Sequence, residues 1–230
     1  MTSPAVGIRA RNRAALEAEI LAAGRRHLAE HGAAALSLRA IARDLGMASS
    51  AVYRYVASRD ELLTLLIVEA YDSLGDAVDN AVAGQVDPLE RFRIIGRATR
   101  TWAAAHPHQF TLVYGSPVPG YQAPAERTVE PGTRVVAHLI GVLAELAPSW
   151  AGAAPDERAE RALAGLIADP TMAGLALPPV LLSRGLAAWA LVLGSITAER
   201  FGHYGPDSIS DPDAHFEGML DLAAGLVTAS

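Results

Sequence analysis

The sequence contains neither cysteine nor lysine. Without cysteine, disulfide bonds and thiolate metal ligands are excluded, and the fold is indifferent to the redox state of its compartment. Long apolar runs are also missing: the longest, Leu186 to Ile196, has eleven residues, whereas a membrane-spanning helix needs about 20. The first thirteen residues, MTSPAVGIRARNR, are polar and arginine-rich, unlike a secretory signal. We therefore expect a cytoplasmic protein with no membrane partner.

Charge is unevenly distributed along the 230 residues. The net charge of −6 argues against general nucleic-acid binding by the chain as a whole. Residues 1–60, however, hold nine arginines and five acidic residues, a net +4, while residues 61–230 hold ten arginines and twenty acidic residues, a net −10. This asymmetry is typical of a basic nucleic-acid-binding segment attached to an acidic body. Chance variation in an arginine-rich composition is the alternative.

Apolar residues make up 51% of the chain, enough for a sizeable core, and they repeat at helical spacing. No stretch alternates long enough to indicate a strand, so we predict an all-α fold. We assign residues 1–58 to a first domain, 59–83 to a connecting helix and 84–230 to a second, larger helical domain. The predicted helices cover residues 11–31, 38–45, 49–55, 59–83, 88–105, 107–114, 125–147, 156–168, 179–202 and 212–228.

The first three predicted helices form the pattern of a helix-turn-helix. Ser37 is placed to cap the second helix, and Gly46 supplies the left-handed residue that ends it. Ser58 and Glu61 predict a capping box at the start of the connecting helix, in which each side chain binds the other residue's backbone N–H. Small residues allow a helix to approach base edges in the major groove, while Tyr and Arg donate to phosphate oxygens. The third helix turns Val52 and Val56 inward and leaves such residues outside: Ser49, Ser50, Ala51, Tyr53, Arg54 and Tyr55.

Residues 32–63, GAAALSLRAIARDLGMASSAVYRYVASRDELL, resemble the DNA-binding region of the TetR family of repressors. The matching positions are Gly32, Ser37, Arg39, Ile41, Ala42, Gly46, Tyr53, Tyr55, Arg59 and Glu61. The resemblance implies that DNA phosphates are held by Ser37, Tyr53, Tyr55 and Arg59. It places nearest the bases Arg39, Ser49, Ser50 and Arg54.

Ala48 departs from the family pattern, because a Ser or Thr usually caps the recognition helix there. Ser49 is then the alternative cap, which leaves the start of that helix open. Taken singly, Tyr53 could also pack between helices, and Arg54 and Arg59 could be merely solvated.

Residues 101–115, TWAAAHPHQFTLVYG, resemble the Trp-His-Gly type of TetR C-terminal domain, and such domains usually bind small molecules. The matching positions are Trp102, His106 or His108, and Gly115. If the helix continues through Pro107, a pocket for a small, largely apolar effector has an aromatic wall made of Trp102, His106, Phe110 and Tyr114. The loop from Gly115 to Pro124 then forms its entrance, and ordinary core packing is the alternative. Weaker candidates for the same pocket are His138 and Trp189.

The two C-terminal helices carry more apolar surface than one neighbouring helix covers. One stripe contains Leu182, Leu186, Trp189 and Leu193, and the other contains Phe216, Met219 and Leu220. Two copies of each helix predict an isologous four-helix dimer interface, with burial inside one chain as the alternative.

Enzyme signatures are missing: the sequence has no nucleophile elbow, phosphate-binding loop or His-Glu-x-x-His zinc motif, so we expect no catalysis, cofactor or metal. The sequence predicts a bacterial, ligand-responsive repressor that binds a palindromic double-stranded DNA operator as a homodimer. The alternative from another class is a helical small-molecule binding or carrier protein without significant DNA affinity.

Overall fold

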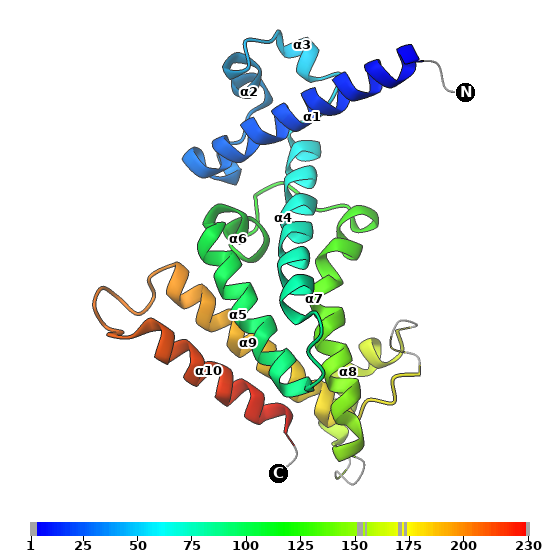
Figure 1. Cartoon of the computed structure of the whole chain (residues 1–230), viewed down its shortest axis with the longest axis vertical. Helices are drawn as coiled ribbons and strands as arrows, with labels where there is room; N and C mark the ends of the chain where they lie inside the picture. Colours follow the sequence, from blue (N-terminus) through cyan, green and yellow to red (C-terminus); the bar gives the residue numbers. More distant parts are fainter. Residues whose placement is uncertain (1–3, 151–153, 155, 170–171, 173, 229–230) are drawn as a thin grey trace. The chain divides into compact units, whose positions relative to one another are not determined.

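The computed structural model describes residues 4–150, 154, 156–169, 172 and 174–228, and these form helices and connections without a strand (Figure 1). The predicted all-α fold is confirmed. The helices are α1 (Pro4–His31), α2 (Leu38–Asp44), α3 (Ser49–Val52), α4 (Arg59–Val82), α5 (Pro88–Ala105), α6 (Pro107–Tyr114), α7 (Ala125–Leu146), α8 (Glu157–Ile167), α9 (Pro179–Arg200) and α10 (Pro212–Val227), with 3₁₀ turns η1 (Ala33–Ala35) and η2 (Ala147–Trp150).

Two helices near the N-terminus differ from their predicted extents. Helix α1 begins at Pro4 and not at residue 11, since a proline is tolerated in the first turn of a helix. Helix α3 ends at Val52 and not at residue 55. Beyond it, the N–H groups of Arg54 and Tyr55 bond to carbonyls three residues back, at 3.3 and 2.9 Å. The chain therefore tightens into turns after α3 and does not extend the α-helix.

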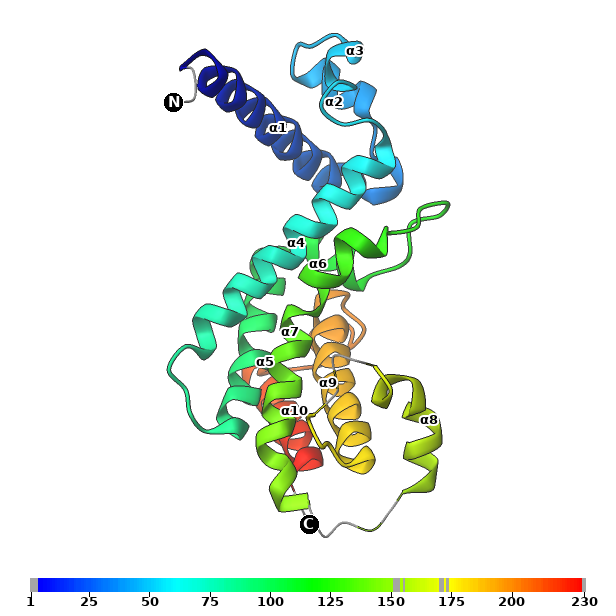
Figure 2. The same ribbon diagram turned by 90° about the vertical axis from the view of Figure 1, so that its right-hand side faces the viewer.

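The chain divides into two compact units. Unit 1 comprises the residues up to Ser73 together with His106–Gly132, and unit 2 comprises Leu74–Ala105 and the residues from Thr133 onward. Unit 1 thus contains α6 and the loop that follows it, in addition to the predicted DNA-binding domain. In both views of the ribbon, α2 and α3 lie side by side next to α1 (Figures 1 and 2).

Unit 1 is built around a core that joins all of its N-terminal helices. Buried side chains from α1, the η1–α2 connection, α2, α3, the α3–α4 connection and the start of α4 form one cluster: Ile20, Ala23, Leu36, Leu38, Ile41, Ala42, Val52, Val56, Leu62, Leu63 and Leu66. Burying a large apolar side chain stabilises a fold by about 1.5–3 kcal/mol, so this cluster holds the short α2 and α3, which are too short to be stable alone.

The loop from Gly115 to Pro124 is irregular, as predicted, and it is attached to unit 1. Val118 and Tyr121 pack against the core cluster. The Thr64 hydroxyl donates to the Asp60 carbonyl at 2.9 Å, so its oxygen accepts from the Tyr121 hydroxyl, also at 2.9 Å. These contacts attach the loop to the first turns of α4.

Only one of the two hydrogen bonds of the predicted capping box forms at the start of α4. The Glu61 N–H donates to the Ser58 hydroxyl at 3.0 Å, as expected. The Glu61 carboxylate instead receives Nη1 of Arg127 at 2.7 and 2.8 Å. The prediction considered only local partners, whereas Arg127 comes from the beginning of α7 and offers a charge-assisted bond, which is stronger than a bond to a backbone N–H.

Unit 2 is organised around α9, which packs against α10, α8 and α5. Among the described residues, α9 is the one helix long and apolar enough to cross a membrane by length and composition, yet it packs as a core helix does on one side. Helices α5 and α10 also approach closely, since a Cβ added at Gly96 would lie 2.4 Å from Leu220. A larger residue at position 96 would require the Leu220 side chain to move.

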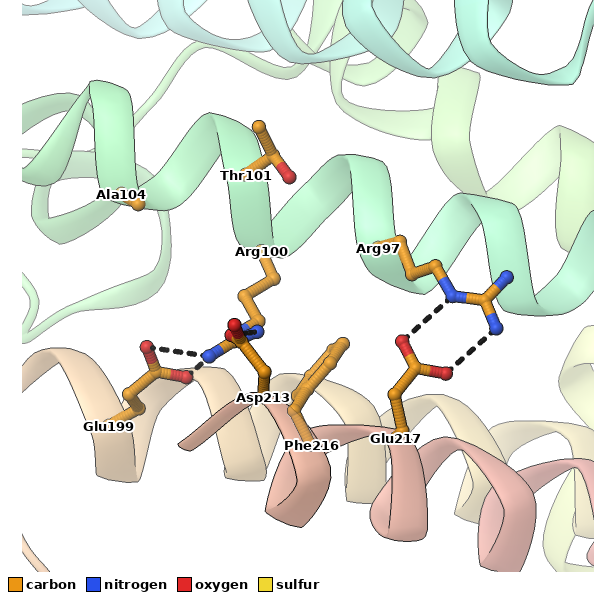
Figure 3. Close-up of a pocket in the computed structure, with 8 residues that line it drawn as sticks. All are labelled: Arg97, Arg100, Thr101, Ala104, Glu199, Asp213, Phe216 and Glu217. Carbon is orange, nitrogen blue, oxygen red and sulfur yellow. Dashed lines mark hydrogen bonds and ion pairs between the residues drawn. The ribbon is translucent and has the colours of Figure 1, made fainter. Parts of the chain in front are cut away.

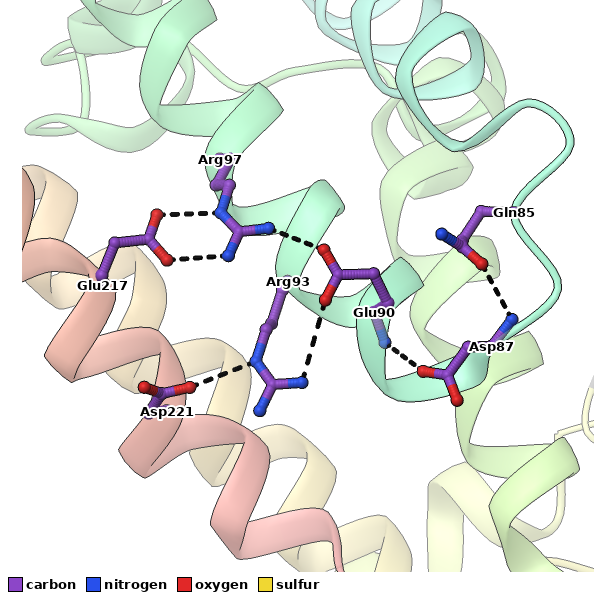
Figure 4. A network of polar contacts seen from close by, with 7 residues as sticks. All are labelled: Gln85, Asp87, Glu90, Arg93, Arg97, Glu217 and Asp221. Carbon is purple, nitrogen blue, oxygen red and sulfur yellow. Dashed lines mark hydrogen bonds and ion pairs between the residues drawn. The ribbon is translucent and has the colours of Figure 1, made fainter.

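An ion-pair ladder joins α5 to α10 along their antiparallel faces (Figures 3 and 4). Its rungs are Arg93–Asp221 at 3.2 Å, Arg97–Glu217 at 2.7 and 2.8 Å, and Arg100–Asp213 at 2.7 Å. The arginines are one helical turn apart on α5 and the acids one turn apart on α10, so each rung fixes the register of the next. The middle rung is bidentate, the strongest geometry for such a pair.

The middle rung makes stability depend on pH. The bond from Arg97 holds the pKa of the Glu217 carboxyl below its usual value. Its contribution is therefore present above the ordinary glutamate pKa, about 4.3, and is lost as the pH falls through the lower folded-state value. Glu217→Gln should reduce the free energy of unfolding near neutral pH by about 1 kcal/mol or less, because the pair is half-exposed. Thermal denaturation at neutral and at acid pH measures the difference, which should shrink as the pH falls through the lowered pKa of Glu217.

The control is Glu157→Gln on α8, whose partner Arg161 lies 3.4 Å away with both side chains largely exposed. That substitution should leave stability unchanged at both pH values. Equal destabilisation by Glu217→Gln at neutral and acid pH would show that the charge of Glu217 contributes nothing.

Candidate nucleic-acid interface

The turn between α2 and α3 is fixed by a glycine in the left-handed region. Gly46 has φ 64°, as predicted for the residue that ends α2. Its N–H bonds to the Arg43 carbonyl at 3.1 Å, and the Met47 N–H bonds to the Ala42 carbonyl at 2.8 Å. These two bonds form a Schellman motif, which satisfies the last carbonyls of α2. The angle at which α3 leaves α2 is thereby set by backbone geometry.

The start of α2 presents two of the predicted DNA-binding residues. The Ser37 oxygen accepts a hydrogen bond from the Ala40 N–H at 3.4 Å, which confirms the predicted cap. A hydroxyl that accepts through its oxygen still has a proton to donate, so Ser37 can also bind a phosphate oxygen. Arg39, in the first turn of α2, is exposed to solvent.

Helix α3 and the turn that follows it expose three of the six side chains predicted to face outward. Ser50, Tyr53 and Arg54 are exposed, with 45% of Tyr53 accessible, while Ser49 is half-buried. The cap position is Ala48, which makes no side-chain bond, and the helix begins at Ser49. Ser49 therefore does not cap the helix, and the start that the sequence left open is settled.

Tyr55 is half-buried and lies beneath an arginine that sequence reasoning did not single out. The guanidinium of Arg13 on α1 lies 5.7 Å from the centre of the Tyr55 ring, within the range of a cation–π contact. This contact places a positive charge of α1 next to the turn that follows α3. The arginine-rich beginning of the chain was the signal that could have indicated it.

Arg59 is engaged by the protein itself. Its Nη2 donates to the carbonyls of Ala33 and Ala34 at 3.1 and 3.3 Å, and its Nη1 lies 3.3 Å from Asp60. Arg59 therefore ties η1 to the start of α4. A phosphate role for Arg59, implied by the family pattern, stays a prediction, because phosphate would compete with these acceptors.

The predicted effector residues do not share one helical face. Helix α5 ends at Ala105, and α6 starts again at Pro107 with His106 as an exposed cap residue, since proline cannot continue the hydrogen bonding of α5. Trp102 and Phe110 are buried, in unit 2 and unit 1 respectively. The rings of Phe110 and Tyr114 are 5.3 Å apart. The condition for one aromatic face, a helix that continues through Pro107, is therefore not met, and a pocket role for each residue stays a prediction.

The two weaker effector candidates lie in different surroundings. His138 lines a cavity in unit 2, while Trp189 is half-buried on α9.

The residues predicted for the dimer interface differ in how far they are buried. Three of them are buried within their own unit: Leu182, Phe216 and Leu220. The other four, Leu186, Trp189, Leu193 and Met219, retain exposed surface, and 45% of Leu186 is accessible. The exposed Leu222 of α10, which the sequence analysis did not include, joins them.

The fold and the interface define a class of protein: a helix-turn-helix regulator of transcription. Residues 20–66 match the family model for bacterial regulatory proteins of the tetR family, and residues 92–223 match the tetracyclin repressor-like C-terminal domain. The chain belongs to the TetR family of transcriptional regulators. The Trp-His-Gly subtype of the C-terminal domain stays a prediction.

Similar proteins agree with this assignment. The HTH-type transcriptional regulators Rv1816 of Mycobacterium tuberculosis (strain ATCC 25618 / H37Rv) and Mb1846 of Mycobacterium bovis are each 42% identical over 225 residues, or 96% of each chain. The crystal structure of the regulatory protein SCO4313 is 32% identical with a TM-score of 0.78, and covers 94% of this chain and 98% of its own. A TetR family regulator from Marinobacter aquaeolei VT8 has the same fold at 19% identity and a TM-score of 0.61, covering 96% and 100%.

Proposed function

We propose that the chain is a cytoplasmic repressor of transcription that binds a palindromic operator as a homodimer and responds to a small molecule. The observation that carries the DNA-binding part is the exposed surface formed by α2, the Gly46 turn and α3. It combines a fixed helix geometry with exposed donors of the types that contact phosphates and bases: Arg39, Ser50, Tyr53 and Arg54. The basic charge of residues 1–60 adds attraction to DNA.

The dimer is supported by apolar surface left open on α9 and α10. Six of the 22 residues of α9 are buried within the chain. Leu186, Ala190 and Gly194 are exposed at one-turn spacing on α9, and Gly218, Leu222 and Gly225 are exposed in the same way on α10. Small residues around one leucine on each helix permit close approach of a second copy. An isologous contact of these helices would place two copies of the reading surface, formed by α2, the Gly46 turn and α3, in one assembly.

A ligand response is supported by the continuity of α4. Its first turn contains Arg59, which contacts η1 in unit 1, and its last residue, Val82, lines a cavity in unit 2. A ligand that binds one tilt of α4 more tightly would change the spacing of the two reading surfaces. A coupling of about 1–3 kcal/mol would weaken DNA binding roughly 5- to 150-fold.

The test is a gel-shift assay of the purified protein against DNA flanking its own gene, followed by transcription of a reporter from that DNA. We expect a shift that survives excess unrelated DNA, and lower transcription when the protein is added. A protein without DNA affinity, such as a carrier, would give no shift at any salt concentration. Raised transcription would be consistent with DNA binding but would contradict a role as a repressor.

A further inference from the structure

A cavity of about 360 Å³ lies in unit 2 between the end of α4, the connection to α5, and the helices α5 and α7. Its apolar lining includes Val82, Ile95 and Val142, and its polar lining consists of Gln85, Arg91 and His138. The volume is at the lower end of the range for small-molecule sites, and an apolar wall with a few polar groups is the usual composition of such sites.

The larger cavity of unit 2 differs in its polar groups. It measures about 410 Å³ and is lined by the ion-pair ladder (Figure 3). There, Arg97 and Arg100 are already bonded to Glu217, Glu199 and Asp213. A ligand in that cavity would have to break these bonds, so the smaller cavity is the better candidate.

Arg91 is a charged residue of the smaller cavity whose hydrogen bonding is incomplete. Its side chain is 22% exposed, and among the described residues no group accepts a hydrogen bond from its buried Nε or Nη2. Nη2 lies 2.6 Å from a carboxylate oxygen of Glu145, which balances its charge but lacks hydrogen-bond geometry. Buried donors nearly always have acceptors, and a guanidinium presents two parallel N–H groups that match a carboxylate.

The other charges around the cavity permit an anion beside Arg91. His138 contacts Asp79 at 2.5 Å, and Arg134 binds the second oxygen of Asp79 at 2.5 Å. The bond to His138, followed by that to Arg134, holds the pKa of Asp79 below its usual value, so this carboxylate is ionised and its charge is met by these partners. Glu145 is 49% exposed and can turn into water when another carboxylate takes its place. Gln85 is held by the Asp87 N–H at 3.0 Å (Figure 4).

We propose that this cavity binds a small monocarboxylic acid. Its carboxylate accepts from Nε and Nη2 of Arg91, and its hydrocarbon part lies along the accessible apolar surface of Val82 and Ala137. A phosphate ester fits poorly, because its greater charge and additional oxygens need more donors than this lining provides. Binding of the acid does not depend on DNA, whereas its role as the effector rests on the proposed function.

The test measures binding of hexanoate to the purified full chain by calorimetry, with hexanol and hexylamine as probes of matched length. We expect hexanoate to bind and the alcohol and amine to bind at least tenfold more weakly. Arg91→Met, which keeps an apolar stem without N–H groups, should weaken hexanoate at least tenfold, and Arg91→Lys should fall between. The control Arg161→Met, at a position 73% exposed, should bind as the wild type does.

A second variant fills the cavity and leaves Arg91 intact. A Cβ added at Gly141, on the cavity lining, meets no described atom within 4 Å, so Gly141→Leu should fold normally and exclude hexanoate. Melting temperatures without ligand verify that both variants are folded. Equal affinity of wild type and Arg91→Met, equal affinity for hexanol, or unimpaired binding by Gly141→Leu would each overturn the proposal.

A measurement of release from operator DNA distinguishes failure of the acid-binding site from failure of the proposed function. If hexanoate releases the wild type but not Arg91→Met from operator DNA, the cavity is the effector site. If hexanoate binds without release, the acid site stands and only its regulatory role is rejected. If no operator binding is seen at all, the proposed function fails while the calorimetric result still decides the site.

Discussion

The double substitution Leu186→Arg and Leu222→Arg should convert the protein from a dimer to a monomer. These leucines on α9 and α10 are 45% and 60% exposed within one chain, which is unusual for large apolar residues on helices whose other faces form a core. In an isologous interface each arginine appears twice, without an acidic partner. An uncompensated buried charge costs about 3–5 kcal/mol, so the dimer dissociation constant should rise at least 100-fold.

Sedimentation at micromolar concentration measures this change. The control is Val86→Arg, because Val86 is 84% exposed in the connection between α4 and α5, outside both interface helices. The control should remain a dimer. A double variant that sediments as a dimer, or a wild type that sediments as a monomer, would reject the proposed interface. The monomeric variant should also bind operator poorly, since each copy carries a single reading surface.

Tyr53→Phe should weaken binding to every DNA sequence alike. The substitution keeps the ring and removes the hydroxyl that we expect to donate to a phosphate oxygen. A hydrogen bond to a charged group contributes about 1.5–3 kcal/mol, and a dimer loses two, so affinity should fall on the order of 100-fold or more. Fluorescence anisotropy with operator and with unrelated DNA measures both losses.

Two further variants serve as a control for that result and as a test of sequence specificity. Tyr204→Phe removes a partly exposed tyrosine hydroxyl from the connection between α9 and α10, and should leave DNA affinity unchanged. Arg54→Ala should narrow the difference between operator and unrelated DNA if Arg54 reaches base edges. Unchanged affinity of Tyr53→Phe for both DNAs would remove Tyr53 from the interface.

Local signals predicted the helix-turn-helix well. Gly46 is predictable from its position after an apolar helical stripe, because its left-handed conformation depends only on the residues next to it. Ser37 as a cap is local for the same reason. Because these features need no distant partner, one sequence is sufficient to find them.

Partners that come from distant parts of the chain were not predictable in this way. Arg59 bonds to Ala33, 26 residues earlier, and Tyr121 contacts Thr64, 57 residues away. The ladder between α5 and α10 joins residues 113 and 128 positions apart. An arginine on a helix predicts an ion pair of some kind, but its partner is decided by how the helices pack.

The interface residues on α9 illustrate a different limit. Helix α9 is apolar on most of its circumference, so periodicity does not separate the side that packs in unit 2 from the side left open. Leu182 and Leu186 are one turn apart, yet the first is 3% and the second 45% exposed. The packing of α10, α8 and α5 against α9 makes that distinction.

The proposed operator binding is tested by a hydroxyl-radical footprint of the wild-type protein on DNA flanking its own gene. We expect two protected regions related by two-fold symmetry, with centres about 10 base pairs or a multiple of that apart, because a dimer presents two recognition helices to one side of the duplex. A single protected region without symmetry, or even protection of all DNA, would contradict it.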